Sequence, residues 1–246
     1  MRVFDMLVDE RRHLADMLST LSADQFRTPS LCSGWTVHDV AAHLTTYLRF
    51  GQLKIYAGIV ATAADFDRLN QYLTRRAARR PIDRIIAYLR RHATSRMTIP
   101  RSVYDPILAD VVLHDLDIRV PLGISRTPHE NRLWVTFNHL ANQPSPGFAM
   151  GSRLAGLRLH APDTGWRHGD GALVEGPAES LVLAVGGRTV ALDDLTGDGV
   201  PVLRDRLTRT TPKPGPLRRL TAPLNVLLKP PPPERRTRDA SPPPRN

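Results

Sequence analysis

The segment PSLCSGWTVHDVAAHL, residues 29–44, contains a loop followed by a well-marked helix start. Thr36 and Asp39 have the spacing of a capping box, in which each side chain accepts a hydrogen bond from the backbone N–H of the other residue. The apolar residues that follow recur with helical spacing. The segment therefore predicts a helix that begins at Thr36, passes through His43 and ends near Gly51.

The same apolar periodicity predicts that most of residues 1–148 are helical. Prolines and glycines mark the boundaries: Pro81 separates two helical segments, Pro106 fits the first turn of a helix, and Pro121 with Gly123 ends that helix. Besides the helix from Thr36, the expected helices cover residues 2–21, 65–79, 82–93, 102–119 and 128–141.

Beyond the Pro/Gly-rich residues 143–147, short apolar or alternating runs are separated by turn sequences such as APDTG and TGDG. The strand candidates are Leu154–His160, Ala172–Glu175, Leu181–Val185 and Thr189–Leu192. Residues 178–186 fit a helix equally well, because the segment opens with proline and closes with glycine. We therefore expect an α+β protein with a helical domain over residues 1–146 and a small α/β domain over residues 147–210.

The net charge of +10 raises the question of nucleic-acid binding, but the charge is unevenly distributed. Residues 211–246 contain eight basic and two acidic residues, and 11 of the 22 prolines. A segment with so many prolines and so few apolar residues is expected to be disordered. It has no aromatic residue and no recognition-helix pattern, so nucleic-acid binding is the weakest of our hypotheses, limited to electrostatic contact through this tail.

Cysteine content and hydropathy exclude other classes. Cys32 is the only cysteine and cannot form an intramolecular disulfide. The N-terminal segment has Asp5, Asp9 and Glu10 where a signal peptide needs an apolar run. With 41% hydrophobic residues, the chain can form a core without disulfide or metal staples. A cytoplasmic protein without a membrane segment is expected.

Two of the nine histidines lie in strongly apolar surroundings, His43 and His114. Asp110 precedes His114 by four residues and Asp117 follows it by three, so on a helix all three lie on one stripe. A carboxylate and a histidine on one helix, with a histidine from another, can supply three ligands to a divalent metal. The alternative is that the two histidines are core residues and that Asp110 and His114 form a buried ion pair.

The segments Pro29–Leu44 and Asp110–Gly123 (DVVLHDLDIRVPLG) together resemble the mycothiol-dependent maleylpyruvate isomerase family, whose N-terminal domain is a DinB-like four-helix bundle that binds metal. The segment GLRLHAPDTGWRHGDG, residues 156–171, with GPAESLVLAVGGR, residues 176–188, is similar to the family's smaller, sterol-carrier-like α/β domain. The resemblance covers about residues 1–207, and its blocks occur in the family's order.

The resemblance implies a set of site residues. The family's metal ligands match His43, Asp110 and His114, with Asp110 where Glu is common and with zinc as the expected metal. Its catalytic aspartate and arginine match Asp117 and Arg188, the arginine reaching toward the site from the second domain. Cys32 is expected to have a structural role rather than to act as a nucleophile.

The implied activity is a mycothiol-dependent isomerase or thiol S-transferase. Mycothiol, a low-molecular-weight thiol, would add to the double bond of a small unsaturated diacid, and rotation and elimination would give the trans isomer; transfer of the thiol to an electrophile uses the same residues. The alternative is a non-catalytic metal-binding or regulatory module that keeps the bundle. The excess of arginine over lysine, 31 to 3, is compatible with an actinobacterial source, whose cells make mycothiol.

Overall fold

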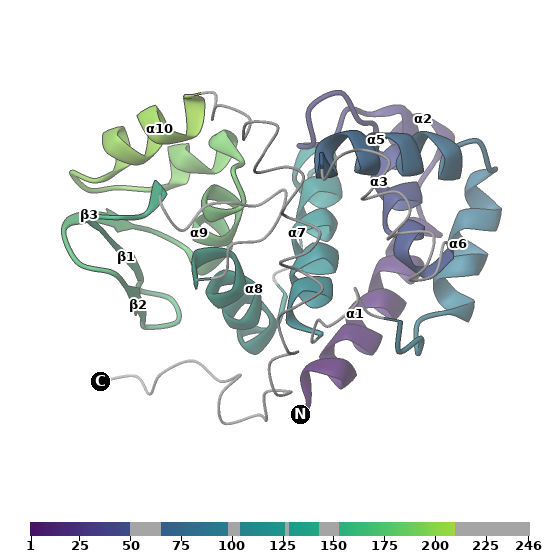
Figure 1. The fold of residues 1–246 in the computed structure, drawn as a ribbon, viewed down its shortest axis with the longest axis horizontal. Helices are drawn as coiled ribbons and strands as arrows, with labels where there is room; N and C mark the ends of the chain where they lie inside the picture. The colour runs from purple at the N-terminus through teal and green to yellow at the C-terminus, as the bar shows by residue number, and fades with distance from the viewer. Residues whose placement is uncertain (50–64, 98–103, 126–127, 143–152, 210–246) are drawn as a thin grey trace. The chain divides into compact units, whose positions relative to one another are not determined.

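The computed structural model describes residues 1–49, 65–97, 104–125, 128–142 and 153–209 of the chain. They form a helical unit, Met1–Arg126, and a smaller unit of helices and strands that begins at Thr127 (Figure 1). The predicted α+β class is confirmed. The predictions for the tail, residues 211–246, lie outside the described residues.

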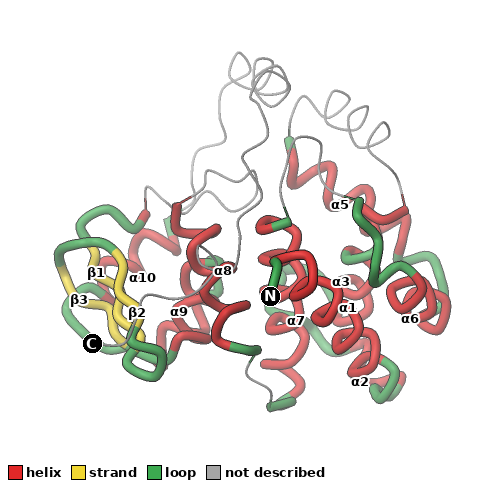
Figure 2. Tube along the Cα trace, turned by 90° about the horizontal axis from the view of Figure 1, so that it is seen from below, coloured by secondary structure: helices red, strands yellow, loops and turns green. Residues whose placement is uncertain are grey.

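The first unit is a bundle of helices. α1 packs against α6 and α7, and α3 packs against α5, α6 and α7. Figure 2 shows α1, α3 and α7 side by side within this unit. The helices are α1 (Val3–Leu18), α2 (Ala23–Arg27), α3 (Val37–His43), α5 (Phe66–Ala77), α6 (Ile82–Arg91) and α7 (Asp105–Leu122).

Helix α7 lies in the interior of this unit, because its residues are buried on nearly every side from Asp105 to Arg119. A helix that is apolar all round is expected to be buried in this way. Leu108, Val112 and Leu116 are fully covered, and each such side chain contributes about 1.5–3 kcal/mol of burial free energy. Most polar residues of α7 therefore face other protein groups rather than bulk water, and Asp110 is partly exposed.

The predicted start of α3 is confirmed. Thr36 is the N-cap: its side chain accepts from the backbone N–H of Asp39 at 3.2 Å, and the Asp39 carboxylate accepts from the backbone N–H of Thr36 at 2.9 Å. The regular helix ends at His43, and helical structure resumes at residues 46–49 after a short turn. The predicted end near Gly51 lies outside the described residues.

Helix α7 continues past the point where the sequence predicts its end. Pro121 lies inside the helix and removes the N–H that would bond to the carbonyl of Asp117. That carbonyl instead accepts from the backbone N–H of Leu31 at 3.1 Å. The substitute bond lets the helix tolerate Pro121 and holds the loop before α3 against α7. Gly123, in the left-handed conformation with φ 65°, then ends the helix.

The described residues of the second unit form a three-stranded sheet and four helical segments. The strands have the order β2–β1–β3, with β1 antiparallel to β2 and parallel to β3. α8 packs on α9, and α9 also contacts β1. The elements are α8 (Glu130–Asn142), β1 (Leu157–Ala161), β2 (Trp166–His168), β3 (Ala172–Glu175), α9 (Ala178–Val185), the 3₁₀ helix η2 (Thr189–Asp194) and α10 (Val200–Thr208).

The described residues of the second unit contain some of the strands predicted from the sequence and lack others. The strands predicted around β1 and at β3 are present, and residues 178–185 adopt the helical alternative. The strand predicted at Thr189–Leu192 is wrong, because these residues form the 3₁₀ helix. Neither β2 nor α10 was expected.

Helix α8 groups with the second unit rather than with the bundle. It packs on α9, and the ring of Trp134 in α8 lies tilted against that of Trp166 in β2, with centroids 5.3 Å apart. Trp166 is 1% exposed, so this aromatic contact belongs to the core of the second unit. The two compact units therefore divide near residue 126, whereas the sequence predicts a boundary at 146.

None of the described helices has the length and apolar character needed to span a bilayer.

Candidate metal centre

The three residues expected to bind metal converge in the interior of the first unit. Nε2 of His114 lies 3.4 Å from Oδ1 of Asp110, and Nε2 of His43 lies 3.7 Å from the same oxygen. The two imidazole rings meet edge to face with centroids 4.9 Å apart. Helix α3 supplies His43, and α7 supplies the other two residues from successive turns.

The spacing of these atoms suits a small divalent cation. All three potential ligand atoms lie within 4.8 Å of one another. Around a tetrahedral ion with bonds of about 2.0–2.1 Å, neighbouring ligand atoms are about 3.3–3.4 Å apart. The distances from the two Nε2 atoms to Oδ1 of Asp110 are close to this value. Small movements of the side chains would therefore place the three ligand atoms at three corners of a tetrahedron.

The other nitrogen of each histidine is engaged by a polar side chain. Nδ1 of His114 lies 2.8 Å from Oδ2 of Asp117, and Nδ1 of His43 lies 3.1 Å from Oγ1 of Thr74. When both Nδ1 atoms donate a hydrogen, each Nε2 presents a lone pair toward Asp110. This is the usual arrangement of histidines that bind a metal.

The charged groups of the cluster stabilise one another. Burial alone would raise the pKa of Asp110, but hydrogen bonds and positive charge from His114, and next from His43, hold that pKa well below its ordinary value. Burial alone would lower the pKa of His114, but Asp110, Asp117 and Cys32 raise it well above the ordinary value. Without a metal, the cluster therefore favours a carboxylate that faces a protonated His114.

Cys32 contacts this cluster, which the sequence did not indicate. Its Sγ lies 3.1 Å from Oδ2 of Asp117 and 3.5 Å from Nδ1 of His114. Cys32, His114 and Asp117 thus form a second group with metal-binding spacing, on the opposite side of the His114 ring from Asp110. The thiol supports the carboxylate that orients His114, in keeping with the structural role expected for Cys32.

Two further residues around the site, Arg11 and Tyr47, were not predicted. Arg11 is buried and donates to the carbonyl of Ser95 at 2.9 Å; burial lowers its pKa to about 10 although the charge of Asp110 acts in the opposite direction. Tyr47 is half-buried near the same carboxylate, and burial followed by that negative charge raises its pKa. Because Arg11 and Tyr47 lie far from Asp110 in sequence, only the tertiary structure reveals them.

The remaining candidates lie elsewhere. Asp115, on the same helix, pairs with Arg119 at 2.7 Å. Arg188 lies in the second unit, immediately before η2, and donates to the carbonyl of Gly186. Its role toward the metal centre stays a prediction. Two histidines outside the cluster have their own partners: His38 contacts the carbonyl of Arg80 at 3.3 Å, and His160 pairs with Glu175 at 2.6 Å.

The comparison with protein families supports the resemblance seen in the sequence. Residues 7–115 match the model of the mycothiol maleylpyruvate isomerase N-terminal domain. The match includes most of α1, all of α3 and α7 as far as Asp115, and therefore all three residues of the candidate metal centre. No curated protein matches the sequence significantly.

Solved structures with the same fold extend the likeness to the second unit. The crystal structure of a mycothiol-dependent maleylpyruvate isomerase has 15% identity and a TM-score of 0.52, over 87% of this chain and 95% of the other. A histidine-to-alanine mutant of a mycothiol-dependent maleylpyruvate isomerase gives 16% identity with the same TM-score and coverage. At this identity the likeness establishes the fold, and the activity must be argued from the residues of this chain.

Proposed function

We propose that this chain, with an N-terminal domain that matches the mycothiol maleylpyruvate isomerase model, is a metal-dependent enzyme that uses mycothiol on a small electrophilic substrate. The reaction would be addition of the thiol followed by isomerisation, or transfer of the thiol. The observation that carries the proposal is the convergence of His43, Asp110 and His114 on one point in the interior of the bundle.

The donor set favours zinc. Two imidazole nitrogens and one carboxylate oxygen form a common set for catalytic zinc, which keeps a fourth position open. Asp is one methylene shorter than Glu, yet Oδ1 of Asp110 already lies within 3.7 Å of both Nε2 atoms. The side chain of Asp110 is 18% exposed whereas His43 and His114 are nearly buried, so the carboxylate marks the side from which a ligand would enter.

A divalent ion held there would lower the pKa of a coordinating thiol and favour the thiolate. The chain's own residues prepare the site for this chemistry. Asp117 accepts from Nδ1 of His114 and fixes the ring, and Thr74 does the same for His43. Arg188 is proposed to pair with a carboxylate of the substrate, because a guanidinium group binds carboxylate oxygens through two parallel hydrogen bonds. We extend the proposal to a cytoplasmic location, where a low-molecular-weight thiol stays reduced.

Metal analysis of the purified full-length protein tests the first step. We expect about one equivalent of zinc in the wild type after incubation with zinc and desalting, and almost none in His43→Ala or His114→Ala. His13→Ala is the matched control, since His13 is exposed on α1. Zinc content that is the same in all four proteins would contradict the proposal.

Mycothiol binding and turnover test the second step. In the zinc-loaded wild type, the melting temperature should rise as the mycothiol concentration is increased. Mycothiol should not change the melting temperature of His114→Ala. Conversion of a cis-unsaturated diacid should require both mycothiol and zinc. Zinc binding without stabilisation by mycothiol would instead favour the non-catalytic metal-binding module.

A further inference from the structure

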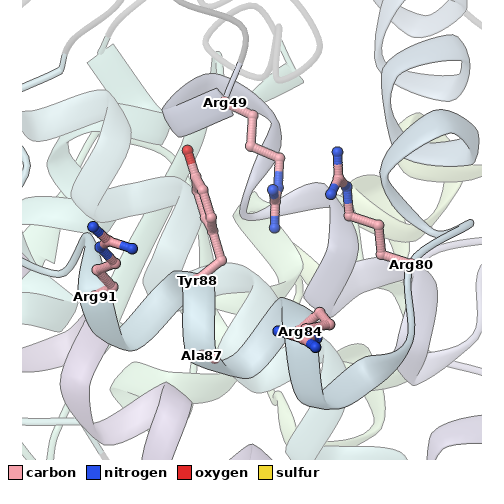
Figure 3. A pocket seen from close by; sticks show the side chains of 6 residues that line it. All are labelled: Arg49, Arg80, Arg84, Ala87, Tyr88 and Arg91. Atoms are coloured by element: carbon pink, nitrogen blue, oxygen red, sulfur yellow. The ribbon is translucent and has the colours of Figure 1, made fainter.

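A cavity in the first unit, separate from the candidate metal centre, is lined by basic side chains. It has a volume of about 430 Å³ and is lined by Arg49, Arg80, Arg84, Ala87, Tyr88 and Arg91 (Figure 3). None of these residues belongs to the candidate metal centre. Helix α6 supplies one side of the cavity, while Arg49 follows α3 and Arg80 follows α5.

Little negative charge offsets these four arginines. Among the described residues, Arg84 forms an ion pair with Asp83, with its Nε 3.9 Å from the carboxylate and both side chains largely exposed. The sequence that follows Arg49, residues 50–64, contains one lysine and no Asp or Glu. The cavity therefore concentrates positive charge well beyond the average of the chain.

One of the arginines is held in place in advance. The guanidinium carbon of Arg49 lies 3.5 Å from the centre of the Tyr88 ring, and its Nε donates to Oγ1 of Thr45 at 3.1 Å. The Tyr88 hydroxyl donates to the carbonyl of Leu48 at 3.2 Å, which fixes the ring in turn. Because Arg49 is already ordered, a ligand that binds it would lose less conformational entropy on association.

In the absence of an anion, the positive charges of the arginines around the cavity repel one another. Burial, and next the like charge of Arg80, lower the pKa of Arg49. His92 stacks edge-on against Tyr88 at 4.0 Å, and burial followed by the charges of Arg91 and Arg49 lowers its pKa as well. Like charges gathered in a partly desolvated cavity destabilise the protein unless an anion neutralises them.

We propose that this cavity is an anion site for a diphosphate group, bound by Arg49, Arg80 and Arg84. Figure 3 shows these three side chains on one side of Tyr88, with Arg91 on the other side. Guanidinium groups bind phosphate oxygens through paired hydrogen bonds, and three of them match a ligand with about three negative charges on adjoining groups. Inorganic pyrophosphate and a nucleoside diphosphate share this chemistry.

Calorimetric titration of the full-length protein with inorganic pyrophosphate tests the site. At low salt we expect one saturable site in the wild type, and at least a tenfold increase in Kd for Arg49→Gln and for Arg80→Gln. Arg79→Gln is the matched control, because it removes one exposed positive charge beside Arg80 without touching the cavity. Its Kd should stay within about threefold of the wild type by the screening of exposed charges.

Three outcomes would overturn the proposal. Equal weakening by Arg49→Gln, Arg80→Gln and Arg79→Gln would show that general positive charge binds the anion. Equal binding of citrate would show that the cavity does not select phosphate. Loss of pyrophosphate binding in His114→Ala, with its fold verified by circular dichroism, would place the anion at the metal centre. A parallel titration with ADP separates the two sources: tighter binding than pyrophosphate assigns a nucleoside diphosphate, and weaker binding assigns the inorganic anion.

Discussion

Oδ2 of Asp117 lies 2.8 Å from Nδ1 of His114, on the opposite edge of the ring from Nε2, which lies 3.4 Å from Asp110. The imidazole therefore lies between two carboxylates. That of Asp117 is completely buried, and that of Asp110 is at the open side of the cluster. The buried carboxylate fixes the direction in which Nε2 points, so the geometry of the proposed metal centre depends on a residue that does not bind the metal.

Replacement of Asp117 by Asn should weaken zinc binding without abolishing it. The amide is neutral, and it can donate through its NH2 group as well as accept through its oxygen, so it supports less strongly the form of His114 that presents a lone pair at Nε2. Loss of such a supporting partner typically costs 10–100-fold in metal affinity. Competition with a fluorescent zinc chelator would measure the change. Asp16→Asn, which alters an exposed carboxylate on α1, should leave the affinity unchanged; equal affinity for Asp117→Asn would refute the orienting role.

Stability without metal should depend on pH through the same cluster. The raised pKa of His114 contributes stability that is complete below about pH 6.5, its ordinary pKa, and that is lost as pH rises through the higher folded-state pKa. The lowered pKa of Asp110 contributes stability that is present above about pH 3.8 and is lost as pH falls toward its folded-state value. Melting temperatures measured in chelator should therefore decline above neutral pH, with a flatter profile for His114→Gln.

Zinc should reverse this trend, since the metal displaces the proton from Nε2 of His114. The increase in melting temperature caused by zinc should grow from pH 6 to pH 8. An increase that is constant over this range would contradict competition between zinc and the proton at this nitrogen.

The thiol of Cys32 supports Asp117 at 3.1 Å, and its removal should have a smaller effect than removal of Asp117 itself. Cys32→Ser keeps a donor, whereas Cys32→Ala leaves the buried carboxylate with one fewer hydrogen bond, worth about 0.5–1.5 kcal/mol. We expect less than tenfold weakening of zinc binding in Cys32→Ala and none in Cys32→Ser. If either variant kept its zinc but lost all activity, Cys32 would be a nucleophile rather than a structural residue.

The clustering of Asp110 with His114 was predictable because its signals are local. The four-residue separation of Asp110 and His114 places both on one helical stripe, and the apolar residues around them show that the stripe is buried. That His43 faces the same stripe followed only from the family resemblance. The contacts of Cys32 with the cluster, and the electrostatic effect of Asp110 on Arg11 and Tyr47, depend on chain segments that meet only after folding.

The errors in the fold have similar causes. Pro121 normally ends a helix, but the Leu31 N–H satisfies the carbonyl that this proline leaves without a partner, and the helix continues. Three-residue strand β2 is too short to show a period, and its pairing with β1 determines it. Helix α8 has a helical pattern that could serve either unit, and only its packing on α9 assigns it to the second.

The capping box of α3 offers a test that separates stability from metal binding. Thr36 and Asp39 satisfy each other's backbone N–H groups, and His43 follows on the same short helix. Thr36→Ala should lower the free energy of unfolding by about 1 kcal/mol, whereas Thr36→Ser should retain most of it. Because the helix is held by packing once the protein has folded, zinc affinity below the melting transition should stay within about twofold of the wild type. A large loss of zinc affinity in Thr36→Ala, measured by chelator competition at 10 °C, would show instead that the cap itself sets the position of His43.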